Sequence, residues 1–75
     1  MQRYANRSGH SGVVAYALGD DAITVKFTGG DRYLYDVEST GADHIARMRA
    51  LAREGQGLST YISQHVRERY ARKLD

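Results

Sequence analysis

The 75-residue chain contains no cysteine and no proline. Without cysteine, neither a disulfide nor a thiolate-ligated zinc ion can hold so short a fold together, so its stability has to come from apolar packing. The chain also lacks an apolar run long enough to span a bilayer, and its first twelve residues lack the apolar segment of a secretory signal. We therefore expect one cytoplasmic domain covering residues 1–75, with no membrane association.

Hydrophobic residues make up 41% of the chain and charged residues 27%, which is typical of a folded globular domain. The net charge is only +2, but it is unevenly distributed. Residues 1–45 carry four Arg or Lys and six Asp or Glu, whereas residues 46–74 carry seven and two. This asymmetry indicates either a polyanionic partner or helix C-termini, where cations are stabilised by the helix dipole.

Residues 23–27 and 33–37 show a period of two, in which large β-branched or aromatic side chains occupy alternate positions, and residues 13–18 are a third candidate strand. Their β-branched and aromatic content predicts half-buried strands. Gly19, Asp20 and Asp21 supply turn residues after the first segment. Because the connections are short, the three strands are expected to form an antiparallel meander.

After the third strand the apolar period changes to that of a helix. Thr40 is a candidate N-cap, with Asp43 three residues later in a pattern close to a capping box, and Gly55 is a stop signal. The stripe of this helix is Ala42, Ile45, Met48 and Ala52. A second stripe runs to the C-terminus and comprises Leu58, Tyr61, Ile62, Val66 and Tyr70. The sequence predicts an α+β fold, a three-stranded antiparallel meander followed by two C-terminal helices packed on one sheet face (β-β-β-α-α).

The segment FTGGDRY leaves two pairings of the second and third strands open. If residues 29–31 form a three-residue loop, Phe27 faces Tyr33. Val25 then faces Tyr35, and all the large apolar side chains share one face. A two-residue turn would slip the register by one and move both tyrosines to the opposite face. So small a domain needs its aromatic residues in the core, so we expect the three-residue loop.

The order of the motifs along the chain is also informative. It comprises a start with Ser8 and Ser11, a strand reaching Tyr16, an L-x-V-x-F strand (Ile23, Val25, Phe27), a turn at Gly30, a Y-x-Y-x-V strand (Tyr33, Tyr35, Val37), a helix ending at Gly55 and a further helix with Ile62. In this order the residues resemble the KTSC domain, a small module named for its relation to the C-terminal region of a lysyl-tRNA synthetase. The resemblance covers about residues 8–74 and implies this architecture and an association with nucleic acid, without catalytic residues. Glu38 stands where the family often has proline, and Leu58 where it has an aromatic residue.

The segment Gly9-His10-Ser11-Gly12 is similar to part of the nucleophile elbow of serine hydrolases. That elbow needs a glycine two residues after the serine, because the strained turn leaves no room for a side chain, and this chain has Val13 there. The elbow also opens a helix, whereas Ser11 precedes a strand. We interpret Ser11 as part of a turn whose hydroxyl groups bond to nearby backbone, and we expect no enzyme activity.

The histidines and glycines do not indicate a cofactor. His10, His44 and His65 match no recognised pattern of metal ligands. His65 lies on the second apolar stripe, where a half-buried ring with a hydrogen-bond partner is expected. The pair Gly29-Gly30 joins two strands, whereas phosphate loops lead into helices. We expect no metal and no cofactor.

The arginine residues of the second half are the strongest functional signal. Arg49 and Arg53 are i and i+4 neighbours, a repulsive arrangement that a bound anion would relieve. The candidate RNA-binding residues are Arg49, Arg53, Arg67, Arg72 and Lys73, which Arg32 and Lys26 could extend into a diffuse surface without base specificity. Arg69, Arg72 and Lys73 cluster near the C-terminus, and the alternative interpretation of this cluster is a solvated helix end.

Two functions follow from these observations. The first is a small non-enzymatic module that binds RNA or another polyanion through a basic helical surface. The alternative is a protein–protein interaction or self-association module that uses an open sheet edge or the outer helix surface. It is motivated by a short meander, which leaves unpaired edges, and by a core that is thin for a monomer.

Overall fold

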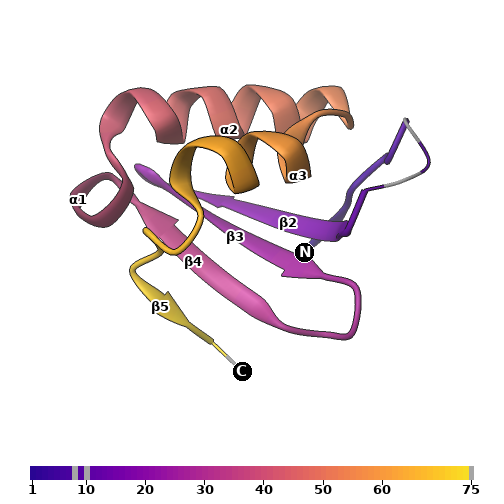
Figure 1. Ribbon diagram of the computed structural model, residues 1–75, viewed down its shortest axis with the longest axis horizontal. Coiled ribbons are helices and arrows are strands. Elements are labelled where there is room, and N and C mark those ends of the chain that lie inside the picture. The colour runs from indigo at the N-terminus through magenta and orange to yellow at the C-terminus, as the bar shows by residue number, and fades with distance from the viewer. Residues whose placement is uncertain (8, 10, 75) are drawn as a thin grey trace.

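The computed structural model describes residues 1–7, 9 and 11–74. They form a five-stranded antiparallel sheet in the order β1-β2-β3-β4-β5, with the helices on one of its faces (Figure 1). The α+β class and the central antiparallel meander are therefore confirmed. The count of three strands and two helices is wrong, because two-residue strands add to both edges and the helical part is divided into more segments. The elements are β1 (Gln2–Arg3), β2 (Val13–Gly19), β3 (Ala22–Phe27), β4 (Arg32–Asp36), α1 (Val37–Thr40), α2 (Ala42–Glu54), α3 (Leu58–Tyr61), η1 (Ile62–Val66) and β5 (Arg72–Lys73).

The β3–β4 register differs from the predicted one by two residues. Val25 pairs with Tyr33 and Ile23 with Tyr35, and the amide of Phe27 donates to the carbonyl of Asp31 at 2.8 Å. The loop is therefore residues 28–30. A shift of two residues preserves the side to which each side chain points, so the predicted face of both tyrosines is confirmed although the predicted partners are wrong.

The helical region begins one turn earlier than the sequence indicates. The carboxylate of Asp36 accepts a hydrogen bond from the amide of Ser39 at 2.8 Å and caps the short helix α1. Thr40 is the last residue of α1 and Gly41 is the N-cap of α2, so the predicted N-cap at Thr40 is wrong. Thr40 is instead fully buried, and its hydroxyl donates to the carbonyl of Arg69 at 2.6 Å. Helix α2 ends as predicted at Gly55, whose φ of 77° is the left-handed conformation that glycine adopts without strain.

The predicted second helix stops well before the C-terminus. Helix α3 continues as the π-helical turn η1, which the amide of Arg67 closes by donating to the carbonyl of Ile62 at 2.6 Å. Arg67 then has a φ of 40° and the chain turns back toward the sheet. The unpaired edge of β4 offers backbone partners there, and the amides of Ala71 and Leu74 donate to it at 2.6 and 2.7 Å. Arg69, Arg72 and Lys73 therefore do not lie at a helix end, whereas Arg67 is the C-cap of η1.

The core lies between the helices and one face of the sheet. Its buried side chains come from both layers and are Tyr4, Val13, Tyr16, Ile23, Val25, Tyr35, Ile45, Met48, Leu51, Ala52, Leu58, Ile62 and Val66. Tyr4, just after β1, is buried beneath the helices, and its hydroxyl accepts a hydrogen bond from the amide of Leu58 at 3.2 Å. The start of α3 is thereby given an acceptor for one of its free amides.

Candidate functional site

The second face of the sheet is covered by no helix or loop of the described residues, and we call it the open face. Alternate residues of each strand point to it, since their neighbours Ile23, Val25 and Tyr35 point into the core. A bulge places Val14 as an extra residue here, where its side chain is 39% exposed. The open face consists of Arg3, Val14, Ala15, Ala17, Thr24, Lys26, Arg32, Leu34 and Arg72.

Cations line up across the open face because of the strand register. Arg3 pairs with Ala15, Ala15 with Lys26, and Lys26 with Arg32, so one row crosses four strands. Neighbouring strands are about 4.8 Å apart, so this row is about 14 Å long. Arg72 lies in the adjacent row, opposite Leu34. The four cations Arg3, Lys26, Arg32 and Arg72 are called the basic row below.

The structure does not bring the five predicted RNA-binding residues together. Arg49 reaches down from α2, where its guanidinium donates to the carbonyls of Gly19 and Ala22, the latter at 3.2 Å. The guanidinium of Arg49 is therefore held by backbone carbonyls at the connection between β2 and β3. Arg53 is exposed in the last turn of α2, and Arg67 follows the turn η1.

The two predicted residues in β5 point to opposite faces of the sheet. Arg72 belongs to the basic row, whereas Lys73 lies opposite Tyr33 on the helix side. The ammonium of Lys73 is 3.7 Å from a carboxylate oxygen of Asp31 and 5.9 Å from the ring centre of Tyr33. The basic surface therefore lies on the sheet as well as on the helices, and Arg3 is a member that the sequence analysis missed.

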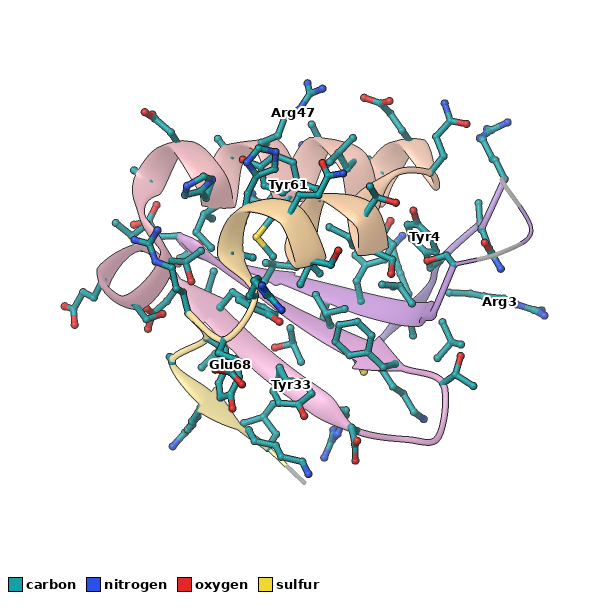
Figure 2. The ribbon with its side chains drawn as sticks, viewed as in Figure 1. Arg3, Tyr4, Tyr33, Arg47, Tyr61 and Glu68 are labelled. Carbon is teal, nitrogen blue, oxygen red and sulfur yellow. The ribbon has the colours of Figure 1, made fainter. Side chains whose placement is uncertain are left out.

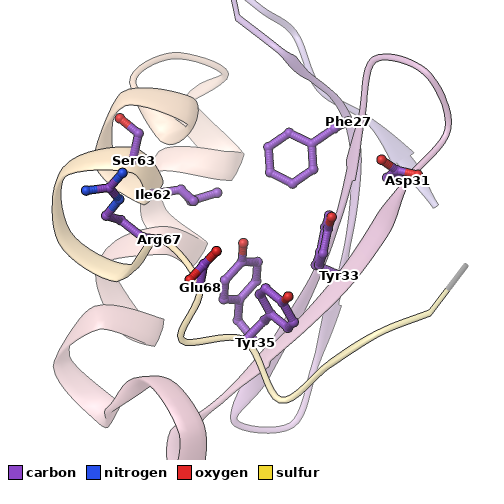
Figure 3. A pocket seen from close by; sticks show the side chains of 9 residues that line it. Phe27, Asp31, Tyr33, Tyr35, Ile62, Ser63, Arg67 and Glu68 are labelled. Atoms are coloured by element: carbon purple, nitrogen blue, oxygen red, sulfur yellow. The ribbon is translucent and has the colours of Figure 1, made fainter.

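A cleft of about 380 Å³ opens at the edge of the helix side, and we call it the tyrosine cleft (Figure 3). Its apolar walls come from β3, β4, η1 and the C-terminal segment and are Phe27, Tyr33, Tyr35, Ile62 and Tyr70. Its polar lining residues are Asp31, Ser63, Arg67 and Glu68. Burial, reinforced by the nearby Tyr33 and Tyr70, raises the pKa of Tyr35 to about 12, so this hydroxyl stays neutral at physiological pH.

Ser11 lies in a turn, as the sequence predicts. Its hydroxyl accepts a hydrogen bond from the amide of Val13 at 3.0 Å, and its own amide donates to the side chain of Asn6 at 3.1 Å. The hydroxyl is therefore engaged in starting β2. The predicted turn spans residues 8–12, and two of its members, Ser8 and His10, lie outside the described residues.

Two histidines and a tyrosine meet between α2 and α3. Nδ1 of His44 is 2.7 Å from the hydroxyl of Tyr61, whose ring centre is 4.4 Å from that of His65. His65 is exposed, so the prediction of a half-buried ring is wrong; the turn η1 directs Ile62 and Val66 to the core instead. Within the described part of the chain, no three His, Asp or Glu side chains are grouped as they would be around a metal ion.

Both edges of the sheet are short. β1 and β5 have two residues each, and β5 consists of charged residues. Short, charged edge strands disfavour the addition of another strand. The edges that the alternative function invokes are therefore partly covered by the chain itself, at Ala15 and Tyr16 of β2 and at Tyr33 and Leu34 of β4.

Comparisons of the chain with family models, with curated proteins and with solved structures gave no match. The resemblance to the KTSC domain therefore stays a prediction. No helix among the described residues has the length and apolar character needed to cross a membrane.

Proposed function

We propose that this protein is a non-enzymatic cytoplasmic module that binds the phosphate backbone of RNA through the open face. The observation that carries the proposal is the basic row, in which four cations lie on an uncovered face among uncharged side chains. Arginine and lysine on an accessible surface supply the charge-assisted contacts that hold phosphates. The predicted resemblance to the KTSC domain implies the same class of partner.

The composition of the open face favours backbone contact over base recognition. Its uncharged residues are aliphatic or small, such as Ala15, Ala17 and Thr24, whereas base recognition in single strands uses aromatic rings. We therefore expect binding with little sequence preference. With four cations in contact, the logarithm of the binding constant should fall with the logarithm of the salt concentration with a slope of about −3.

The decisive experiment compares two double variants that remove the same charge. Arg3→Gln with Lys26→Gln removes two cations of the basic row, and it should weaken binding to a labelled single-stranded RNA and reduce the salt slope by about 1.4. Arg47→Gln with Arg53→Gln is the matched control on α2. Both of its arginines are exposed, and Figure 2 shows Arg47 projecting away from the sheet. It should leave the slope nearly unchanged.

The outcomes separate the candidate surfaces. If the α2 variant loses affinity and the open-face variant does not, the helical surface binds RNA and the basic row does not. If wild-type protein fails to bind RNA at low salt, the proposed function is wrong. Affinity that does not respond to salt would exclude phosphate contacts altogether.

A further inference from the structure

The tyrosine cleft lies on the face opposite the basic row, so the proposed function does not account for it. We propose that this cleft binds an organic ammonium group, such as a trimethylated amine on an alkyl chain. The arrangement of its rings, its carboxylates and the side chain of Lys73 carries this inference.

The rings of the cleft are arranged for a compact cation. Phe27 and Tyr33 meet at an interplanar angle of 75°, Tyr33 and Tyr70 at 52°, and Tyr35 and Tyr70 at 90°, with ring centres 4.7 to 6.1 Å apart. A flat base stacks best against parallel walls, whereas steeply inclined rings present their electron-rich faces from several directions. Such faces attract a quaternary ammonium ion.

The charges of the cleft point to the same ligand. Asp31 and Glu68 place carboxylates at opposite sides of the aromatic wall, and Figure 3 shows the carboxylate of Glu68 directed toward the tyrosines. The same view shows the guanidinium of Arg67 directed away from Phe27 and Tyr33. Of the charged residues that line the cleft, Glu68 is therefore directed toward the rings and Arg67 away from them.

The chain already holds one ammonium at the mouth of the cleft. Lys73 lies 5.9 Å from the centre of the Tyr33 ring and 3.7 Å from Asp31, which is the combination of aromatic face and carboxylate that a ligand would use. Both Lys73 and Asp31 are about half exposed, at 49% and 55%, so this contact is weak and can be displaced.

The side chain of Tyr35 also belongs to the cleft. Tyr35 is only 2% exposed and is one of the residues that line the cleft. An oxygen at the surface of the cleft can contact the positive methyl groups of a trimethylammonium ion. The volume of about 380 Å³ lies in the range of small-molecule sites and leaves room for the attached alkyl chain.

The test uses nuclear magnetic resonance titration of the whole chain with three probes. Choline and trimethyllysine amide carry the cation, and 3,3-dimethylbutanol is the neutral analogue of choline with the same shape. Both cations should shift the amide resonances of Tyr33, Tyr35 and Glu68, and the neutral analogue should bind about tenfold more weakly. Tighter binding of trimethyllysine would identify a methylated protein side chain as the source, and tighter binding of choline a free small molecule.

Two variants distinguish this site from a purely apolar pocket. Glu68→Gln should weaken choline binding about fivefold, whereas Glu54→Gln, an exposed control on α2, should not. Lys73→Gln should strengthen binding, because it frees the mouth of the cleft. The proposal is overturned if no cation shifts these resonances, if the neutral analogue binds equally well, or if Lys73→Gln weakens binding. RNA binding by the Arg3→Gln, Lys26→Gln protein is measured separately, so the two proposals fail independently.

Discussion

Neighbouring residues of the same strands build the two faces of the sheet, yet these faces are under different constraints. On the helix side, the exposed fraction of Ile23, Val25 and Tyr35 is at most 2%. These side chains therefore have to fit each other in size and shape. On the open face, Thr24 and Leu34 are only half-buried and lie among cations. The comparison indicates that stability resides mainly in the helix side, whereas the open face is available for binding.

The largest expected effect on the free energy of unfolding comes from removing a large core side chain on the helix side. Tyr35→Ala should destabilise the protein by about 4 kcal/mol, because it removes a large buried side chain and leaves a cavity. Leu34→Ala, one residue earlier and on the open face, should cost about 1 kcal/mol. Urea unfolding followed by circular dichroism measures both. Similar losses for the two variants would contradict the division between the faces.

Gly55→Ala tests how the N-terminal segment closes the helix side. The left-handed φ of Gly55 strains any side chain, and a Cβ there would overlap the Cβ of Ala5, next to the buried Tyr4. We expect a loss of about 3 kcal/mol. Gly29→Ala is the control with a similar φ of 98° but no atom within reach of the new Cβ. It should cost about 1 kcal/mol in thermal or urea unfolding. Equal losses would show that close packing against Ala5 is not needed.

Thr40→Val tests the attachment of the C-terminal segment to the helix side. The variant keeps the shape of the side chain but leaves the carbonyl of Arg69 without its buried donor. A loss of about 1.5 kcal/mol is expected. Thr28→Val removes an exposed hydroxyl bonded to the carbonyl of Gly12, and it should cost much less in the same unfolding assay. A smaller loss for Thr40→Val than for Thr28→Val would refute this account.

The double variant Arg3→Gln, Lys26→Gln should hardly affect stability. Both residues lie on the open face, so we expect a change within about 0.5 kcal/mol, in contrast to its effect on RNA binding. Melting temperatures measured at equal salt check this. A large loss would mean that the basic row also supports the fold.

The smallest effect is a pH dependence at the end of β4. The amide and hydroxyl of Ser39 hold the pKa of Asp36 below its ordinary value, so the ionised form stabilises the folded state. This stabilisation is present above the unfolded-state pKa of about 4 and is lost as the pH falls through the folded-state pKa. Asp36→Ala should therefore be less stable than the wild type at pH 7, and the gap should narrow in acid. A gap that is independent of pH would contradict a charged cap.

The sequence predicts the centre of the fold because period-two alternation directly reports which side of a strand is buried. Ile23 and Val25 are such positions, and Gly55 is a comparably local signal for the end of a helix. The strand β1 has only two residues, so it shows no alternation, and the burial of Tyr4 depends on its docking against Leu58, far along the chain. Tyr70 has helical spacing from Val66, which predicts that the helix continues to Tyr70. The chain instead leaves the helix, and the amide of the next residue, Ala71, donates to the carbonyl of Leu34 in β4.

The candidate surfaces were harder to predict because each depends on pairing between distant residues. Lys26 can be assigned to the polar side of its strand from sequence alone. Its alignment with Arg3, however, depends on the β1–β2 register and on the bulge at Val14. The prediction that Arg49 binds RNA depended on its spacing from Arg53 alone. Its acceptors at Gly19 and Ala22 are separated from it by 30 and 27 residues, so local spacing does not indicate them.

The brevity of β5 has a kinetic consequence. So short a strand can detach from β4 in a local opening that leaves the rest of the molecule folded. Each opening would withdraw Lys73 from Tyr33 and expose the amide protons of Ala71 and Leu74 to solvent exchange. The exchange rate of these two protons would then report how often the entrance beside Tyr33 is vacated, and that frequency sets an upper limit on how fast a molecule can enter by that route.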